Sequence, residues 1–253
     1  MQIYPSDLTD CQWQFIEKIM SDKRKRKKSL RTVWNGILYL LVSGCQWRML
    51  PKEYGPWESI YYYYRKWKKE GLIEEVHEEL VLKVRNEAGK QESPSVGIID
   101  SQSSKTTSVG GEEIGYDAGK KIKGRKRHII TDTLGLLMTV VVHGADKQDR
   151  SAAESVIETL KYRFPRLTKI FADGGYTGQL LECIKKKFGW FIKIVKRTSE
   201  EFTVLPKRWI VERTFSWINN CRRNSKDYEL LCESSVAMVH LSMIRVMLNR
   251  VYD

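Results

Sequence analysis

The hydrophobic periodicity of the chain changes at residues 90–95, a short polar segment that contains Pro94 and is a candidate linker. Before this segment, apolar residues recur every three or four positions, which is the spacing of helices that bury one face. After it, short apolar runs alternate with amphipathic stretches, which is typical of a sheet covered by helices. A chain of 253 residues is long enough for two domains. We therefore expect a helical domain over residues 1–90 and an α/β domain over residues 91–253.

The first region is predicted to be a small helical bundle. The apolar patterns place helices at residues 11–19, 30–41, 57–69 and 72–88. A basic run, Lys23 to Lys28, lies between the first two helices. Helices and turns beside a cationic run are typical of a helix-turn-helix-like DNA-binding bundle. A plain helical bundle with a solvated basic loop is the alternative interpretation.

The second region is predicted to form a mixed sheet. Apolar runs predict strands at residues 96–100, 127–132, 136–143, 168–172 and 190–195, the second and third of which form a hairpin. Amphipathic stretches predict helices at residues 151–163, 177–188, 206–220 and 234–251. The order of three strands, helix, strand, helix, strand and helix fits a mixed sheet with helices on both faces.

Composition limits the partners of the chain. Lys and Arg number 44 against 31 Asp and Glu, a formal net charge of +13, so a polyanion such as DNA is the default partner. A ribosomal or generally adhesive basic protein is the alternative. The longest apolar stretch, Ile37 to Val42, is far shorter than the roughly 20 residues that cross a bilayer, and no signal peptide is visible, so no membrane partner is expected. Five cysteines without a C-x-x-C pair argue for buried thiols in a reducing cytoplasm.

Two acidic residues come directly after apolar strands. Asp100 follows Ile98-Ile99, and Asp173 follows the run that ends at Ala172. Because α/β proteins place ligands at the carboxyl edge of the sheet, two such carboxylates on neighbouring strands would lie close together and repel. A divalent cation such as Mg²⁺ or Mn²⁺ removes that conflict. The alternative is that these residues cap turns, since Gly174-Gly175 follows Asp173.

Glu212 is a third candidate. Within the helix predicted at 206–220, it shares one polar stripe with Arg208 and Ser216, beside an apolar stripe that contains Val211 and Phe215. The carboxylate can therefore face the sheet edge while the helix packs. A surface Arg208–Glu212 ion pair is the alternative.

Six motifs together resemble the bacterial DDE transposases of the IS-four/IS-five superfamily, closest to the IS-five branch. The motifs are GCQWRMLP at residues 44–51, IDSQS at 99–103, GYDAGKK at 115–121, KGRKRH at 123–128, ADGGY at 172–176 and WIVERTF at 209–215. The resemblance runs from about Leu8 to Leu248, nearly the whole chain.

This resemblance implies a ribonuclease H-like catalytic domain after a helix-turn-helix-like DNA-binding domain. It places the catalytic and metal-binding triad on Asp100, Asp173 and Glu212, with Mg²⁺ as the cofactor and Mn²⁺ as a substitute. It also implies a cytoplasmic, nucleoid-associated protein that acts on double-stranded DNA, both element ends and target, as a homodimer or larger assembly. The enzyme would cut the terminal inverted repeats and join the 3′-hydroxyl to target DNA. A metal-dependent nuclease without joining activity and an idle DNA-binding relic are the alternatives.

Basic residues are the expected DNA contacts. They are Lys23, Arg24, Lys25, Arg26, Lys27, Lys28, Arg31, Lys120, Lys121, Lys123, Arg125, Lys126, Arg127, Arg208, Arg213, Arg222, Arg223 and Lys226. The segment 105–128 combines glycines with cations and is interpreted as a loop that closes on phosphates, or as an ordinary hairpin tip. The superfamily signature has Tyr and Lys where this chain has Leu205 and Asn219, which leaves Arg222, Arg223 or Lys226 to supply the charge.

Other residues keep two interpretations. Arg31, Asn35 or Arg65 would read base edges in the first domain. The aromatic residues Trp47, Trp57 and Tyr61–Tyr64 would stack on bases or pack in the core. His128 and His143 would orient acids or serve as hydrogen-bonded structural residues. Asp146 and Asp149 follow a strand, and an auxiliary role at the site is one interpretation of both, but Asp149 is expected to cap the helix that begins at Ser151.

Overall fold

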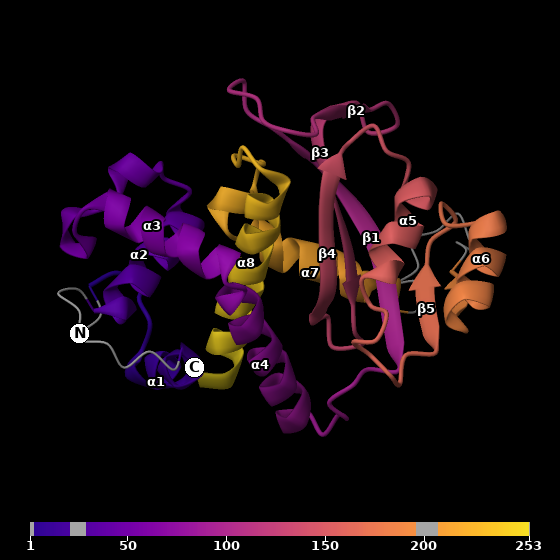
Figure 1. Ribbon diagram of the computed structural model, residues 1–253, viewed down its shortest axis with the longest axis horizontal. Helices are drawn as coiled ribbons and strands as arrows, with labels where there is room; N and C mark the ends of the chain where they lie inside the picture. The colour runs from indigo at the N-terminus through magenta and orange to yellow at the C-terminus, as the bar shows by residue number, and fades with distance from the viewer. Residues whose placement is uncertain (1–2, 21–28, 196–206, 253) are drawn as a thin grey trace. The chain divides into compact units, whose positions relative to one another are not determined.

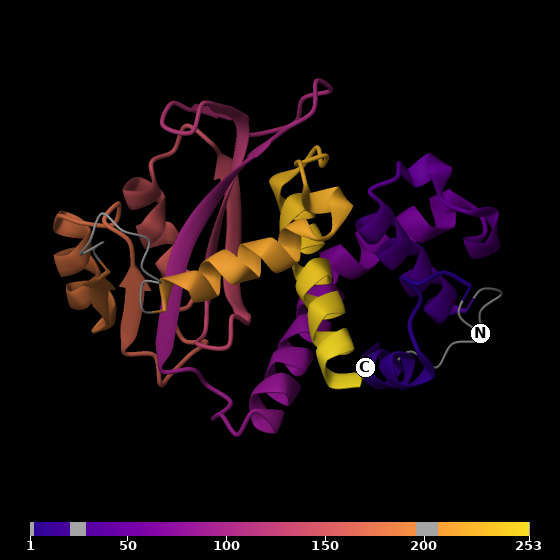
Figure 2. The ribbon, with the colours of Figure 1, turned by 180° about the vertical axis from the view of Figure 1, so that it is seen from behind.

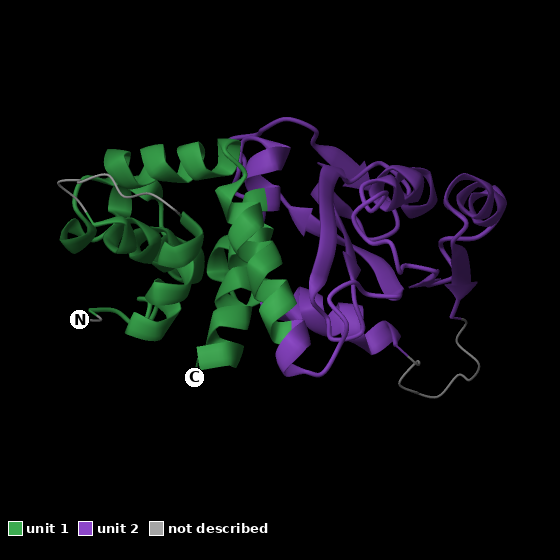
Figure 3. Cartoon of the chain, turned by 60° about the horizontal axis from the view of Figure 1, so that its bottom comes forward, with its two compact units in different colours: residues 1–84, 218–225, 237–253 green, residues 85–217, 226–236 purple. Residues whose placement is uncertain are grey.

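The computed structural model describes residues 3–20, 29–195 and 207–252. Its contacts divide the chain into two compact units, which Figure 3 colours separately. Unit 1 comprises residues 1–84, 218–225 and 237–253, and unit 2 comprises residues 85–217 and 226–236. The last helix thus shares a unit with the N-terminal helices. The assignment of DNA binding to residues 1–90 and catalysis to residues 91–253 stays a prediction.

Unit 1 is helical. Its helices are α1 (Asp10–Met20), α2 (Leu30–Ser43), α3 (Trp57–Lys69), most of α4 (Leu72–Glu87) and the later part of α8 (Cys232–Tyr252). Gly44 ends α2 with a φ of 71°, a left-handed conformation that glycine adopts at little cost. Two short 3₁₀ turns, Trp47–Met49 and Lys52–Tyr54, then lead to α3. The four helices predicted for this region are confirmed.

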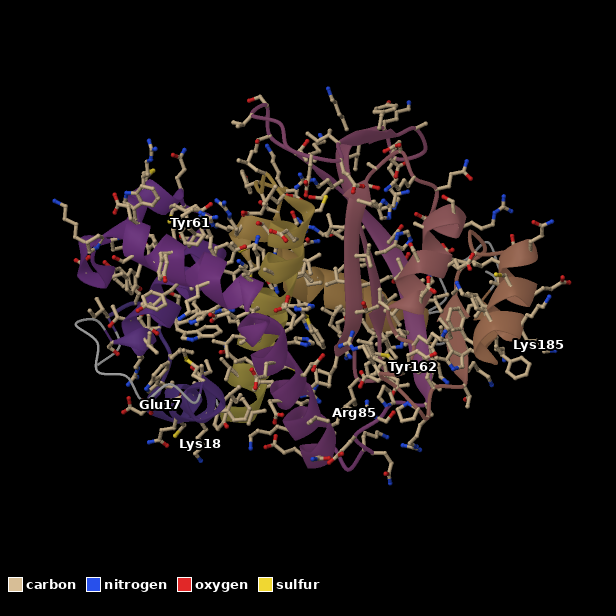
Figure 4. The ribbon with its side chains drawn as sticks, in the orientation of Figure 1. Glu17, Lys18, Tyr61, Arg85, Tyr162 and Lys185 are labelled. Atoms are coloured by element: carbon tan, nitrogen blue, oxygen red, sulfur yellow. The ribbon has the colours of Figure 1, made fainter. Side chains whose placement is uncertain are left out.

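Aromatic side chains form much of the interior of unit 1. Trp34 stacks on Trp67 with ring centroids 5.2 Å apart. Trp47 contacts Tyr61 and Tyr64 at 5.0 and 5.1 Å, and Figure 4 labels Tyr61 on α3. Packing therefore accounts for these rings.

Unit 2 contains the sheet. Its strands are β1 (Val96–Lys105), β2 (Gly115–Asp117), β3 (Ile122–Thr131), β4 (Leu137–Gly144), β5 (Lys169–Ala172) and β6 (Phe191–Ile194). The order is β2-β3-β1-β5-β6, with β4 also paired to β3. β1 is antiparallel to β3 and parallel to β5, so the sheet is mixed, as predicted.

Helices cover both faces of this sheet. On the face toward the viewer in Figure 1, α5 (Asp149–Glu158) packs with α6 (Gln179–Phe188). Their apolar side chains meet Ile99 and Ile130 from the strands in one buried cluster. α7 (Arg208–Asn219) lies on the opposite face, and it passes in front of the strands in Figure 2, the view from behind. The mixed α/β architecture, with its helical N-terminal region, is that of the ribonuclease H-like fold predicted from the sequence.

Two strands are longer than predicted. β1 continues past Asp100 to Lys105, because Ser101 to Lys105 pair with β3. β3 begins at Ile122, five residues before the predicted start at Arg127. Residues 115–128 of the segment 105–128 therefore form the β2–β3 hairpin, which favours the alternative interpretation for this part, whereas residues 107–114 lie outside the strands.

The expectation of buried thiols holds only in part. All five cysteines are free, but Cys11 is exposed and only Cys221 and Cys232 are buried. Across the described residues, no helix combines the length and apolar character that spanning a bilayer requires.

Candidate active site

Asp100 and Asp173 lie at matching positions on two neighbouring parallel strands. The last paired residues of β1 and β5 are Ile98 and Phe171, and each aspartate lies two residues further on. Side chains two residues apart project to the same face, and adjacent strands are about 4.8 Å apart. Both aspartates line one small hollow, together with Val195 and other residues. Asp100 was predicted at the end of a strand, but β1 continues past it: its pairing with β5 ends at Ile98, while its pairing with β3 continues to Lys105.

The surroundings of Asp100 disfavour its negative charge. Burial raises its pKa to about 6 from the ordinary 3.8, and the charge of Asp173 adds to this rise. The backbone amide of Ser101 opposes it by donating a hydrogen bond of 2.7 Å to Asp100 Oδ1. The pair of carboxylates thus carries the charge conflict expected from the sequence.

Arg208 connects the aspartates to the third predicted acid. Its guanidinium lies 3.5 Å from Asp173 and, one helical turn along α7, 3.3 Å from Glu212. Arg208 also lines the hollow that contains Asp100. The Glu212 side chain is 57% exposed, so its carboxylate is accessible to solvent. The Arg208–Glu212 ion pair of the alternative interpretation therefore exists. It does not exclude a role in the site, because Arg208 also contacts Asp173 and lines the hollow that contains Asp100.

The donor groups fit a hard divalent cation. Carboxylate oxygens are ligands that Mg²⁺ and Mn²⁺ prefer. Burial is the main cause of the raised pKa of Asp100, and a cation between Asp100 and Asp173 would offset both this burial and the repulsion from Asp173. Among the described residues, no three His, Cys, Asp or Glu side chains already form a metal-binding group. Arg208 supplies the positive charge beside Asp173 and Glu212.

Three basic residues predicted to contact DNA are buried in unit 2. Arg125 and Arg127 are 0% and 1% exposed, and Lys126 is 4% exposed. Arg125 pairs with Asp227 across 3.2 Å, and Lys126 pairs with Asp149 across 2.9 Å. Because these cations are buried against protein groups, their predicted role as DNA contacts is wrong.

Other predicted DNA contacts are also held by protein groups. Arg213 lies 4.6 Å from each of two tryptophan rings, and the buried Arg223 donates to a backbone carbonyl. Arg31 pairs with Asp10 at 2.5 Å. Asn35 is buried and accepts a backbone hydrogen bond, so it does not present its amide to DNA.

The remaining predicted contacts are exposed or lie outside the described residues. The exposed ones are Lys120, Lys121, Lys123, Arg222 and Lys226. Arg65, the third candidate reader, is also exposed. The run Lys23 to Lys28 lies outside the described residues, so its phosphate contacts stay a prediction.

Ser101 and Tyr176, to which the sequence assigned no role of their own, belong to a set of polar residues behind the aspartates. Ser101 Oγ donates to Asp149 Oδ1 at 2.8 Å, so Asp149 binds the strand, and the helix capping expected of it is not found. His128 shares hydrogen bonds of 2.9 Å with His143 and with the Tyr176 hydroxyl. The histidines are therefore hydrogen-bonded and buried. One sequence signal pointed here, because Ser101 and Ser103 break the apolar alternation of β1.

The mixed sheet, with Asp100 and Asp173 at matching positions of its adjacent parallel strands, has the architecture of a ribonuclease H-like domain. The family model described as a transposase DDE domain matches residues 91–247, and a second, described as a putative transposase of the IS4/5 family, matches residues 8–77. The first match covers more than half of the chain, so the chain belongs to the transposase DDE domain family. Domains of this family generally depend on divalent metal ions.

Two curated relatives come from insertion sequence IS402 of Burkholderia cepacia. A putative transposase is 30% identical over 108 residues, which cover 40% of this chain and 51% of the relative. An uncharacterized 16.2 kDa protein is 29% identical over 113 residues, which cover 41% of this chain and 76% of the relative. The chain thus spans about half the length of the first.

Proposed function

We propose that the chain is an insertion-sequence transposase of the IS-five branch. It binds the terminal inverted repeats of its element, cleaves the DNA ends and joins the freed 3′-hydroxyl to target DNA. Because joining requires two element ends and a target at once, we expect a homodimer or larger assembly on cytoplasmic, nucleoid DNA. The observation that carries the proposal is the matching position of Asp100 and Asp173, each two residues beyond the last pair of β1 and β5, with Arg208 linking Asp173 to Glu212.

The residues of the site have distinct roles in this proposal. Asp100 and Asp173 would hold a divalent ion at the sheet, and Glu212 of α7 would be the third carboxylate ligand. Bound Mg²⁺, or Mn²⁺ in its place, neutralises phosphate charge and makes the attacking hydroxyl more acidic. Arg208 adds a fixed guanidinium that phosphate oxygens can share.

The bond changes require no covalent enzyme intermediate. Water first attacks the phosphodiester at the element end, and the 3′-oxygen leaves as a free hydroxyl. That hydroxyl then attacks a target phosphodiester, whose own 3′-oxygen leaves, so the second step conserves the number of phosphodiester bonds. The same carboxylates serve both steps because both are in-line displacements at phosphorus.

Joining of a pre-cut element end tests the function directly. The full chain, given Mg²⁺, a pre-cut end and plasmid target, is expected to form strand-transfer products that sequencing locates at the 3′-end. Cleavage of an uncut end without joining would instead identify a metal-dependent nuclease. Binding of the ends with neither reaction would identify a relic.

Helix α3 is the part of unit 1 that we propose reads the element ends. Its exposed residues Glu58, Tyr62, Arg65 and Lys69 follow one another by four, three and four positions, so they share one face. Tyr62 is 61% exposed, unlike the packed aromatic residues beneath it. Arg65 can make bidentate contacts with guanine, and Tyr62 can stack on a base or sugar.

Replacement of Arg65 and Lys69 by Ala is expected to weaken binding to element ends. The salt slope of binding should fall by roughly one unit for each lost phosphate contact, and loss of a base contact should reduce discrimination against random DNA by about 1–3 kcal/mol. Fluorescence anisotropy at several salt concentrations measures both effects. Lys90→Ala, at another exposed lysine, is the control. Unchanged affinity and discrimination in the double variant would exclude α3 as the reading helix.

A further inference from the structure

A connected set of buried polar groups lies on the face of the sheet opposite Asp100. Because strand side chains alternate, Ser101 and Ser103 of β1 project to the α5 face, where β3 places His128 and Lys126 opposite them. Asp149, in the first turn of α5, contacts these side chains from the helix that covers this face of the sheet. Ser101 Oγ donates to Asp149 Oδ1 at 2.8 Å, and Lys126 Nζ lies 2.9 Å from the same oxygen.

Ser101 connects these buried polar groups to Asp100. Its hydroxyl is held by Asp149, while its backbone amide donates to Asp100 Oδ1 at 2.7 Å. Ser101 is only 7% exposed, so water does not readily replace either partner. The orientation of the Asp100 carboxylate is thus coupled to Asp149 through one residue, although the two carboxylates lie on opposite faces.

The charges around Asp149 favour a fixed carboxylate. Burial alone would raise its pKa, but the hydrogen bonds from Lys126 and Ser101 outweigh burial and lower it. His128 lies 3.7 Å away, and burial lowers its pKa to about 3, so it is neutral there. Lys126 also donates to a backbone carbonyl at 2.8 Å, which fixes the cation from a second side.

We propose that Asp149 is a positioning residue for Asp100: it holds Ser101 from the α5 face of the sheet, and Ser101 holds the Asp100 carboxylate in the orientation that binds a divalent cation. Asp149 touches neither DNA nor metal in this arrangement. The proposal rests on the proposed function only for the identity of the reaction; the cation affinity of the site tests it separately.

The test compares full-length Asp149→Ala, Asp149→Asn, Ser101→Ala and the double alanine variant with the natural chain. Mn²⁺ binding is measured by electron paramagnetic resonance, alongside cleavage rate, DNA affinity and thermal unfolding. Asp149→Ala is expected to weaken Mn²⁺ binding and slow cleavage by about 10–100-fold, with DNA affinity unchanged. Asp149→Asn keeps an acceptor for Ser101 and should lose less. Glu154→Ala, at an exposed acid of the same helix paired with Lys187, is the matched control.

The double variant distinguishes coupling from general damage. If Ser101 carries the effect, the double variant should be no worse than Asp149→Ala alone. Mn²⁺ affinity within twofold of the natural chain in folded Asp149→Ala, or additive losses in the double variant, would overturn the proposal. Should Asp149→Ala not fold, Ser101→Ala and Asp149→Asn carry the same test. A natural chain that binds Mn²⁺ tightly but cuts no DNA would refute the proposed function and leave the affinity comparison decisive.

Discussion

Replacement of Asp100 by Asn is expected to abolish DNA cleavage and, at the same time, to stabilise the metal-free protein at pH 7. Asn keeps the shape of the side chain but removes the negative charge that a divalent ion needs. We expect the cleavage rate to fall on the order of 10³-fold or more, since metal ligands act mainly in the transition state. Binding to element ends should persist, because it depends on basic side chains and not on the charge of this carboxylate.

The gain in stability follows from the raised pKa of Asp100. Its carboxyl titrates at about 6 in the folded chain, chiefly because of burial, against an ordinary value of 3.8. The folded state therefore holds the proton more tightly, and stability falls as pH rises from about 4 through 6. Asn does not ionise, so the variant avoids this loss. The advantage should be about 1–3 kcal/mol at pH 7 and should vanish at pH 4 and below.

Chemical denaturation across this pH range, without metal, measures the stability difference, and a gel assay with Mg²⁺ measures cleavage. Asp173→Asn and Glu212→Gln should also abolish cleavage, whereas Glu182→Gln, at an exposed acid of α6, should not. Cleavage near the natural rate in any one of the three site variants removes that residue from the site. A stability difference independent of pH would assign the effect of Asp100→Asn to packing instead of charge.

The sequence could predict those parts of the site that short-range patterns in the chain indicate. An apolar run that ends in an acid marked Asp100 and Asp173, and helical spacing put Arg208 and Glu212 one turn apart. The 3.3 Å contact between the last two follows from that spacing. The pairing of β1 with β5 brings together two aspartates that lie 73 positions apart in the chain. Predicting that they meet required the order of the elements as well as their local patterns.

The parts that sequence did not predict depend on distant partners. Asp149 was assigned to a cap because capping rules use neighbouring residues, but its partner Ser101 lies 48 positions earlier. Arg125 was assigned to phosphate because it lies in a cationic, glycine-containing segment. Its acidic partner, Asp227, lies 102 positions later, and no sequence pattern near either residue indicates that the two form a pair.

Arg125 illustrates how a buried cation in this chain differs from a DNA contact. Its guanidinium pairs with Asp227, and both side chains are 0% exposed. It also donates to the backbone carbonyls of Glu112, Glu229 and Leu230 at 2.7–2.8 Å. These bonds tie β3 to the segments at residues 112 and 227–230, all within unit 2.

Replacement of Arg125 by Ala is therefore expected to destabilise unit 2 by about 3–5 kcal/mol, because it leaves the Asp227 carboxylate buried without its cation and the carbonyls without a donor. Arg125→Lys should recover only part of this loss, since an ammonium lacks the planar fork that reaches several acceptors. Urea denaturation followed by circular dichroism measures the loss. Lys121→Ala, at an exposed neighbour, should change stability by less than about 0.5 kcal/mol but reduce the salt slope of DNA binding by roughly one unit. The reverse pattern, a stable Arg125→Ala variant with a reduced salt slope, would restore Arg125 as a phosphate contact and require the side chain to leave its pocket when DNA binds.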